Sequence, residues 1–326
     1  MWITGISDKS PIPIEEFMRR ALHDPRHGYY SRSITGIGRC GDFTTAPMMS
    51  GALAGAVAQW AGGALRETGC RDLIEIGPGE GLLAAAMLRG LPWRTRWKIR
   101  LHLVETSAPL AQNQRKRLGR RVTWHASPAE ALAACGGRAV IFSNELVDAF
   151  PVRGFENSTD GWREIAVTFD AEVMARESLL SPAPLPPSSV FSQNHPPGQR
   201  VEVHDSYRRW LAEWMPLWRA GRMLTIDYGS TADHLYHRRP RGTLRAYLLQ
   251  QRLEGPAIYQ NPGRQDLTAD VNFSDLVEWS RPWTAEHRLL TLAAFLREHG
   301  QTSDLGLTDE AGAGGAFMAL DQLCGL

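Results

Sequence analysis

Three glycines and an acid further along the chain have the types and spacing of a nucleoside-binding site. Residues 72–81 read DLIEIGPGEG, so a short apolar strand runs into a turn that contains Gly77, Gly79 and Gly81. A helix is expected over residues 80–89, and Glu105 ends a second strand-like segment, LHLVE. Glycines let a backbone turn tightly and approach a ligand, and an acid after the second strand can accept hydrogen bonds from ribose hydroxyls. The pattern predicts a nucleoside-bearing cofactor.

Acidic residues beside this turn favour a cationic cofactor over a phosphate-bearing one. The spacing is G-x-G-x-G rather than the dinucleotide pattern G-x-G-x-x-G, and Glu75 and Glu80 flank it. A carboxylate at the start of the helix would repel a pyrophosphate. S-adenosylmethionine (SAM) has no phosphate, and its sulfonium and ammonium groups are cationic, so nearby carboxylates such as Glu75 stabilise it. We therefore predict SAM as the cofactor and disfavour a nicotinamide oxidoreductase.

A second polar group follows the strand expected at residues 139–142. It contains Asn144, Glu145 and Asp148 in the segment NELVDAFP, at a place where open α/β sheets border their ligand crevice. Glu145 and Asp148 could grip two N–H groups of a guanidinium and aim the third nitrogen at a methyl group, so we predict them as the catalytic pair. Asn144 is predicted at the cofactor. The alternative is structural, with Asn144 and Asp148 as caps or loop ties, and for Asp148 the two interpretations are equally favoured.

Two further polar residues have both a functional and a structural interpretation. Ser127 follows the third expected strand, where it either lies at the adenine edge or caps the helix that opens with Pro128. Asp227 either borders the acceptor channel or is a buried aspartate that accepts backbone hydrogen bonds. Methyl transfer from a sulfonium requires no metal, and the histidines give no convincing metal set, so no metal site is predicted.

Composition excludes several classes of protein. The 326 residues are 43% hydrophobic, which suffices for one large domain with elaborations. A net charge of +1 gives the protein no overall positive charge that would attract nucleic acid. The basic runs at residues 114–121 and 237–245 are interpreted first as solvated surface. Cysteine spacing indicates a reducing compartment, and no segment has the length for a membrane span or the form of a signal peptide. We predict a cytoplasmic protein, and a homodimer is compatible with the sequence.

Strand and helix patterns alternate through the first half of the chain. Expected strands at residues 72–76, 98–105, 122–125 and 139–142 alternate with helices at 80–89, 108–118 and 128–134, which predicts a parallel, doubly wound α/β sheet. We divide the chain into an N-terminal helical cap (1–66), a first part of the core (67–150), an insertion (151–205) and a completion of the core (206–326). The completion begins with a helix and a fifth central strand at residues 223–228, and the insertion is expected to form a substrate wall or lid.

Several segments together resemble the MidA-like family of SAM-dependent methyltransferases. The matching runs include LHDPRHGYY at 22–30, GDFTTAP at 41–47, EIGPGEG at 75–81 and NELVDAFPV at 144–152. IDYG at 226–229, GTLRAY at 242–247 and PGRQDLTADVNFSDL at 262–276 follow in the family's order. The resemblance implies a class I methyltransferase, Rossmann-like fold with an N-terminal cap, SAM as cofactor, and Asp42 and Thr45 folded over its methionine end. Thr45 as a helix cap and Asp42 as a loop tie are the alternatives.

The same resemblance implies an acceptor, and the sequence departs from the family at that point. The mitochondrial member is a complex I assembly protein that methylates arginine, which implies a protein substrate, plausibly a respiratory-complex subunit. Here Met48 and Met49 stand where the family usually has an acid, and Leu146 and Val147 stand where it usually has aromatic residues. A small-molecule methyltransferase and a non-catalytic, SAM-binding assembly factor therefore remain alternatives to a protein arginine methyltransferase.

Overall fold

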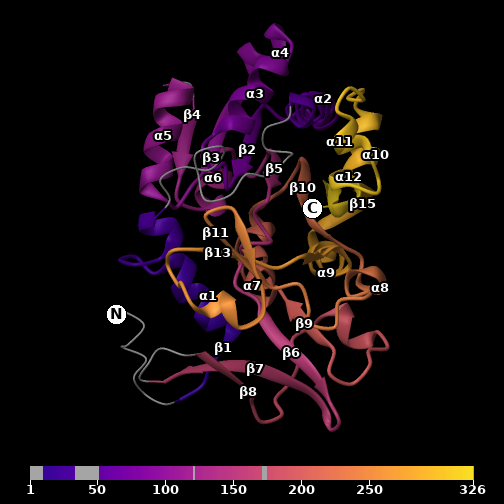
Figure 1. The fold of residues 1–326 in the computed structure, drawn as a ribbon. Coiled ribbons are helices and arrows are strands. Elements are labelled where there is room, and N and C mark those ends of the chain that lie inside the picture. Colours follow the sequence, from indigo (N-terminus) through magenta and orange to yellow (C-terminus); the bar gives the residue numbers. More distant parts are fainter. Residues whose placement is uncertain (1–9, 34–50, 120–121, 171–174, 326) are drawn as a thin grey trace.

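A twisted central sheet organises the computed structural model, which describes residues 10–33, 51–119, 122–170 and 175–325 (Figure 1). Its strands follow the order β15-β16-β10-β5-β2-β3-β4, and β14 pairs with β10 beside this path. Strands β4, β3, β2, β5 and β10 are mutually parallel, whereas β16 is antiparallel to both of its neighbours. The predicted doubly wound α/β sheet is confirmed.

The central strands are β2 (Asp72–Ile76), β3 (Arg100–Val104), β4 (Val122–His125), β5 (Val140–Asn144), β10 (Arg222–Ser230), β14 (Val271–Asn272), β15 (Thr284–Thr291) and β16 (Phe317–Cys324). The other strands are β1 (Ile12–Pro13), β6 (Arg153–Ser158), β7 (Gly161–Phe169), β8 (Ala175–Leu179), β9 (Arg200–Val203), β11 (Arg245–Leu248), β12 (Gln251–Leu253) and β13 (Asp266–Thr268).

The α-helices are α1 (Ile14–His23), α2 (Gly51–Thr68), α3 (Leu82–Gly90), α4 (Trp93–Lys98), α5 (Ala108–Leu118), α6 (Pro128–Ala134), α7 (Asp205–Trp214), α8 (Ala232–Leu235), α9 (Phe273–Ser280), α10 (Leu292–Glu298), α11 (Leu305–Thr308) and α12 (Ala313–Ala316). Short 3₁₀ turns cover Ser189–Ser192, Met215–Leu217, Gly255–Tyr259 and Arg281–Trp283, and a π turn covers Tyr29–Ser33.

Both faces of the central sheet are buried, as parallel sheets require. Alternate side chains along each strand point to opposite faces, so Val140 and Phe142 join one apolar cluster while Ile141 joins the other. Helices α2, α3 and α10 contribute to the first cluster, and α6, α7 and α9 to the second. Trp214 and Trp218 are fully buried in the second cluster.

Two smaller sheets lie outside the central sheet and pack around α1. Strands β1, β7, β6 and β9 form one, with β8 on β7, and β12, β11 and β13 form the other. Helix α1 places Phe17 and Met18 in an apolar cluster shared with Val167 of β7 and Leu267 of β13. The N-terminal helix thus packs on the predicted insertion, whereas α2, also assigned to the cap, packs on the central sheet.

Several element boundaries differ from the sequence prediction, and strands β5 and β10 extend two residues further than expected at their carboxyl ends. Helix α3 begins at Leu82, because Gly81 has a φ of 71° and is the residue before the helix. Strand β3 begins at Arg100, since Lys98 is the last residue of helix α4.

Candidate functional site

The carboxyl ends of β2, β3 and β5 border a cavity with a volume of ≈ 550 Å³. The predicted site residues that line it are Glu75, Gly77, Gly79, Glu105, Ser127, Asn144 and Glu145. Segments from other parts of the fold close it, including Tyr30 after α1, Phe150 and Pro151 before β6, and Trp210 of α7. Of the residues that line this cavity, Pro151 alone belongs to the predicted insertion, so the insertion as a substrate wall or lid stays a prediction. Asp42 and Thr45 lie outside the described residues.

The glycine turn has a backbone that side chains would strain. Gly77, Gly79 and Gly81 have φ values of 66°, 52° and 71°, in the left-handed region that favours glycine. The Gly81 N–H donates to the carbonyl of Pro78 at 2.8 Å, which closes the turn. A Cβ at Gly77 would lie 2.8 Å from Leu146 Cδ1. A Cβ at Gly81 would lie 3.3 Å from Gln114 Cγ, so this glycine permits packing on α5 rather than on the sheet.

Glu105 lies at the cavity just after β3, held by fixed donors. Its carboxylate accepts hydrogen bonds from the Ser107 N–H at 2.7 Å and from Gln114 Nε2 at 3.0 Å. Burial raises the pKa of the Glu105 carboxyl, while these hydrogen bonds oppose the rise. The position agrees with the predicted role as acceptor for ribose hydroxyls, because the carboxylate keeps a fixed orientation toward the cavity.

Gln114 of α5 connects several parts of the site, although no motif in the sequence marks it as a functional residue. Its side chain is fully buried, and its Nε2 donates to the carbonyl of Gly79 at 2.7 Å as well as to Glu105. Its Oε1 accepts from Trp124 Nε1 at 2.9 Å. One amide thus ties the glycine turn, the acid after β3 and strand β4 together. Tyr30 and Trp210 were also not selected, although Tyr30 belongs to the quoted HDPRHGYY segment.

Glu75 presents a buried carboxyl group to the cavity. It is 2% exposed, and its Oε2 has no hydrogen-bond partner among the described residues. Burial, followed by the nearby charge of Glu105, raises the pKa of this carboxyl to about 8. A buried carboxylate without a donor is costly, and a cation in the cavity would stabilise its ionised form. The ammonium group of SAM has the required charge.

Asn144 and Glu145 form a strained corner at the end of β5. Glu145 has a φ of 50°, an unusual value for a side chain of this size. Its backbone N–H donates to the carbonyl of Ile226 at 2.9 Å, and Asn144 Nδ2 donates to Glu145 Oε1 at 3.1 Å. Asn144 Oδ1 is buried without a partner among the described residues. Backbone strain of this kind often accompanies a functional constraint, here the placement of both side chains at the cavity.

The structure does not bring Asp148 into the cavity beside Glu145. Asp148 is 7% exposed, and its Oδ2 accepts a hydrogen bond from the Thr268 hydroxyl at 3.1 Å. Burial raises the pKa of Asp148 to about 6, although Arg245 lowers it. The two carboxyl groups diverge because the left-handed turn at Glu145 redirects the chain. Asp148 therefore connects its loop to β13 through Thr268. The predicted pair of carboxylates, Glu145 and Asp148, does not come together at this cavity.

Asp227 fixes the turn that separates these two acids. Its Oδ2 accepts from the N–H groups of Leu146 at 3.1 Å and Val147 at 2.8 Å, and its Oδ1 accepts from the Tyr228 N–H at 2.9 Å. The side chain is fully buried, and burial raises its pKa well above the usual range. Of the two interpretations of Asp227, the structure shows the buried aspartate with backbone donors.

Ser127 combines a cap with a position at the cavity. Its Oγ accepts from the Glu130 N–H at 3.2 Å, while Glu130 Oε2 accepts from the Ala126 N–H at 2.9 Å. The two hydrogen bonds resemble a capping box at the start of α6, except that Glu130 accepts from the residue before the N-cap. The hydrogen bond to Glu130 supports the interpretation of Ser127 as a helix cap. Ser127 also lines the cavity, and its contact with the adenine edge of the cofactor stays a prediction.

One group of side chains outside the cavity consists of residue types that commonly bind metal ions. Asp72, His102 and Cys135 are buried, with their candidate ligand atoms within 4.8 Å of one another. Asp72 is already paired with Arg100 at 2.6 Å and with His102 Nε2 at 3.0 Å, so the guanidinium offsets its charge. Burial raises the pKa of the Cys135 thiol to about 12, which opposes the thiolate that a metal needs.

The cavity has the features that SAM requires. The carboxyl groups of Glu75 and Glu105 line it together with the glycine turn, which permits close backbone approach. A family model for S-adenosyl-L-methionine-dependent methyltransferases matches residues 56–287. The chain belongs to this family. It is a SAM-dependent methyltransferase with the class I fold, and SAM is its cofactor.

Named relatives and solved structures agree with this assignment. The mitochondrial protein arginine methyltransferase NDUFAF7 of Danio rerio is 28% identical over 331 residues, which cover 89% of this chain and 73% of the relative. The Mus musculus protein of the same name is 28% identical over 340 residues, covering 94% and 75%. The crystal structure of a COG1565 superfamily member from Burkholderia thailandensis bound to S-adenosyl-homocysteine has a TM-score of 0.81 at 27% identity, covering 99% of this chain and 89% of that one.

The expected cytoplasmic location is contradicted by these comparisons. The relatives from Danio rerio, Mus musculus and Caenorhabditis elegans are named as mitochondrial proteins. The prediction rested on cysteine spacing and the form of the N-terminus, neither of which identifies a compartment. Within the described part of the chain, no helix is both long and apolar enough to cross a membrane.

Proposed function

We propose that the protein methylates an arginine side chain of a partner protein. The observation that carries the proposal is the position of Glu145, whose carboxylate lines the same cavity as the glycine turn. The relatives named as protein arginine methyltransferases support the choice of acceptor. Met48 and Met49, which favoured a small-molecule acceptor, lie outside the described residues and give no structural support to that alternative.

Glu145 supplies what a guanidinium acceptor needs. An arginine stays protonated at neutral pH, so a carboxylate must offset its charge and orient its N–H groups. Asn144 Oδ1 is an additional acceptor, because it is buried beside Glu145 without a partner among the described residues. SAM, when bound, supplies a methyl group on a sulfonium. Transfer would form a carbon–nitrogen bond as the carbon–sulfur bond breaks, with a neutral thioether as leaving group, and the Glu145 carboxylate would accept the proton that the nitrogen loses.

The protein contributes mainly alignment and exclusion of water. Tyr30, Phe150 and Trp210 close the cavity with aromatic surface. Asp227 holds the backbone after Glu145, so the carboxylate is positioned before an acceptor arrives. A preorganised carboxylate loses little free energy to reorientation when the acceptor binds.

Incubation of the purified protein and isotopically labelled SAM with a lysate of the host, followed by mass spectrometry, tests the acceptor. We expect label in methylarginine of a protein. E145Q keeps the side-chain shape and removes the charge, so it should lower the transfer rate by about 10- to 100-fold at nearly unchanged SAM affinity. D148N is the matched control and should lower the rate far less.

Three outcomes would reject the proposal. Label that appears only in a metabolite would identify a small-molecule methyltransferase. SAM binding without any transfer would identify a SAM-binding assembly factor. Full activity of E145Q would remove the assigned role of Glu145. The four-part domain division and a homodimer stay predictions, which limited proteolysis and light scattering of the purified protein would test.

A further inference from the structure

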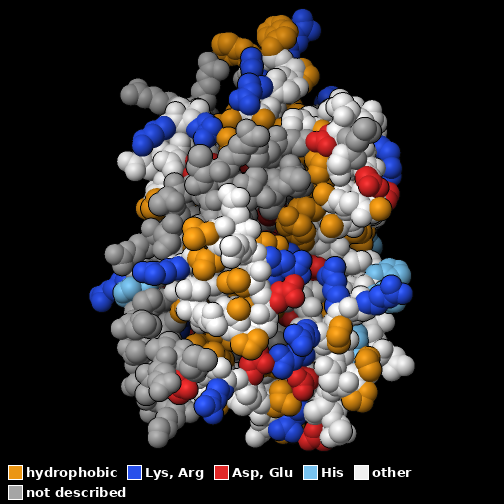
Figure 2. Space-filling view, viewed as in Figure 1, with side chains coloured by type: hydrophobic (Ala, Val, Ile, Leu, Met, Phe, Trp, Pro, Cys, Tyr) orange, Lys and Arg blue, Asp and Glu red, His pale blue; other side chains and the backbone are white. Residues whose placement is uncertain are grey.

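A second cavity, with a volume of ≈ 770 Å³, lies at the carboxyl end of β10 and shares no described lining residue with the cofactor cavity. Its walls come from the loop of residues 236–244, the β11–β12 hairpin and the end of β10. On the face drawn in Figure 2, basic side chains gather with interspersed acidic ones in the middle of the molecule. The basic run at residues 237–245, interpreted from sequence as solvated surface, therefore borders a cavity.

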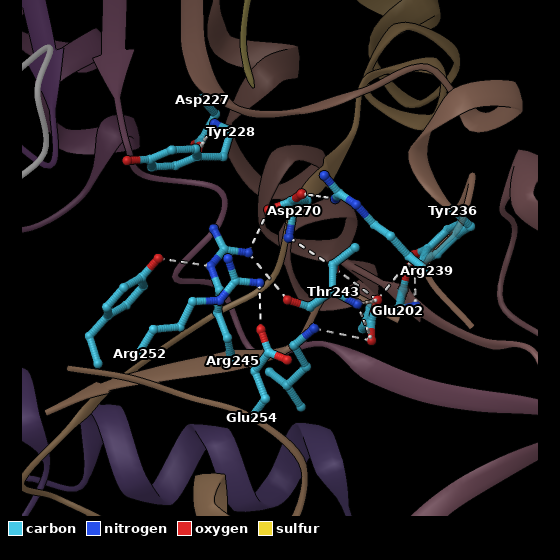
Figure 3. A network of polar contacts seen from close by, with 12 residues as sticks. Glu202, Asp227, Tyr228, Tyr236, Arg239, Thr243, Arg245, Arg252, Glu254 and Asp270 are labelled. Atoms are coloured by element: carbon cyan, nitrogen blue, oxygen red, sulfur yellow. Dashed lines mark hydrogen bonds and ion pairs between the residues drawn. The ribbon is translucent and has the colours of Figure 1, made fainter. Parts of the chain in front are cut away.

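A buried acid holds this loop in one conformation. Glu202 is 5% exposed and accepts hydrogen bonds from the N–H of Thr243 at 3.0 Å and from its hydroxyl at 2.9 Å (Figure 3). The N–H of Leu244 and the hydroxyl of Tyr236 also donate to this carboxyl group. A Cβ at Gly242 would lie 2.1 Å from Glu202 Oε1, so the loop lies directly on the acid. The loop presents its arginines from a fixed backbone, which reduces the entropy cost of binding.

Arginine outnumbers acid in the cavity wall. Asp270 is shared by two guanidinium groups, since it pairs with Arg239 and with Arg245 Nη1 at 2.5 Å (Figure 3). Arg245 also lies over the rings of Tyr228 and Tyr247, at 5.5 Å and 5.8 Å from their centroids. The described lining has six arginines and four carboxylates, which leaves an excess of positive charge.

Two of these arginines are available to a ligand. Arg238 and Arg241 are exposed, and neither has a hydrogen bond or ion pair with a described residue. Arg238 has a φ of 58°, a conformation that costs free energy for a residue other than glycine. A strained backbone that presents an unpaired guanidinium at a cavity wall indicates a constraint imposed by binding.

We propose that this cavity binds a short acidic segment of the protein acceptor, with its Asp or Glu carboxylates paired to Arg238 and Arg241. The proposal rests on the proposed function, because it assigns the docking site for the same acceptor. Arginine forms bidentate pairs with carboxylates. The chain's net charge of +1 gives nucleic acid no general attraction, which favours a peptide over a nucleic acid as the occupant.

The location suits an acceptor whose arginine reaches the cofactor cavity. Tyr228 lines the arginine-rich cavity, and the preceding residue, Asp227, accepts the N–H groups of Leu146 and Val147. These two residues directly follow Glu145 of the cofactor cavity. One β-strand end thus joins the two sites, so a segment docked in the second cavity would deliver a neighbouring arginine to the first.

Fluorescence anisotropy of the full-length protein tests the proposal. The probe is a short labelled peptide of alternating Asp and Gly, compared with the Lys–Gly peptide and with a labelled single-stranded oligonucleotide of equal charge. We expect the acidic peptide to bind most tightly, with an affinity that falls as salt rises. R238E/R241E should weaken its binding by about tenfold. R89E/R96E makes the same charge change near α4 and should leave the affinity unchanged.

Several results would overturn the proposal. These are equal binding of the acidic and Lys peptides, tighter binding of the oligonucleotide, or equal weakening by both double variants. SAM titration of each variant checks that it is folded. If R238E/R241E does not fold, the charge-neutral variant R238Q/R241Q takes its place. Acidic-peptide binding without methylarginine in the lysate would reject the proposed function alone. Methylarginine formation by a protein that does not bind the acidic peptide would reject this inference alone.

Discussion

Glu75 makes the affinity for SAM depend on pH, and E75Q should remove that dependence. Burial and the nearby Glu105 charge raise the pKa of the Glu75 carboxyl to about 8 in the ligand-free protein. Its Oε2 has no partner among the described residues, so a bound ammonium group would favour the ionised form. Binding of SAM below that pH should then release a proton from Glu75.

The magnitude follows from the fraction of ionised carboxyl. With a pKa of about 8, Glu75 is ionised in about 1% of molecules at about pH 6 and in about 10% at about pH 7. If SAM binds the ionised form, its affinity should rise about tenfold over this interval. The SAM amine has an ordinary pKa of about 8, so it stays charged throughout the interval.

Stability should change in the opposite direction. The folded-state pKa of Glu75 lies above its ordinary value, so the folded protein binds more protons than the unfolded chain between these values. The free energy of unfolding contributed by Glu75 is therefore lost as pH rises from about 4.5 toward about 8. E75Q should unfold with a weaker dependence on pH in this range.

Isothermal titration calorimetry in buffers of different ionisation enthalpy measures both the affinity and the released proton. We expect the affinity to rise with pH for the wild type and for E80Q, whose side chain lines the same cavity, but not for E75Q. An affinity that is independent of pH, or that rises equally in E75Q, would show that Glu75 does not face the cation.

Two further predictions concern the turns that build the site. Gly77→Ala should lower the free energy of unfolding by about 1–2 kcal/mol and weaken SAM binding. The reason is that φ at this position is 66° and the new Cβ would lie 2.8 Å from Leu146 Cδ1. Unchanged urea unfolding and an unchanged SAM affinity in calorimetry would contradict this. Asp227→Ala should lower the free energy of unfolding by about 3 kcal/mol, since it leaves buried N–H groups without an acceptor. Asp233→Ala, which replaces an exposed residue of α8, is its control in urea unfolding, and equal losses would refute the assigned role of Asp227.

The parallel core could be predicted because local signals coincide with its elements. Strands β2 and β4 and helices α5 and α6 have the predicted bounds. Each signal is local: Ser127 and Pro128 open α6, Gly119 follows α5, and apolar side chains fill both faces of β2. The same locality made the glycine turn and Glu105 recognisable, since both directly follow strands.

The C-terminal strands and several side-chain directions depend on distant contacts. Strand β15 is largely exposed, so it lacks the apolar alternation that identifies a strand, and its pairing partner β16 lies far along the chain. Gln114 lies in a basic helix with no pattern that marks it as a connection between elements. Asp148 appeared to pair with Glu145 because they are three residues apart, but the left-handed backbone at Glu145 sends them in different directions.

The most direct test of the central claim is a crystal structure of the protein with S-adenosyl-homocysteine. The predicted result places the ribose hydroxyls within hydrogen-bond distance of the Glu105 carboxylate and the ligand's amino group beside Glu75, against the turn at Gly77. Ligand density in the arginine-rich cavity, or at any position away from the glycine turn, would contradict the account.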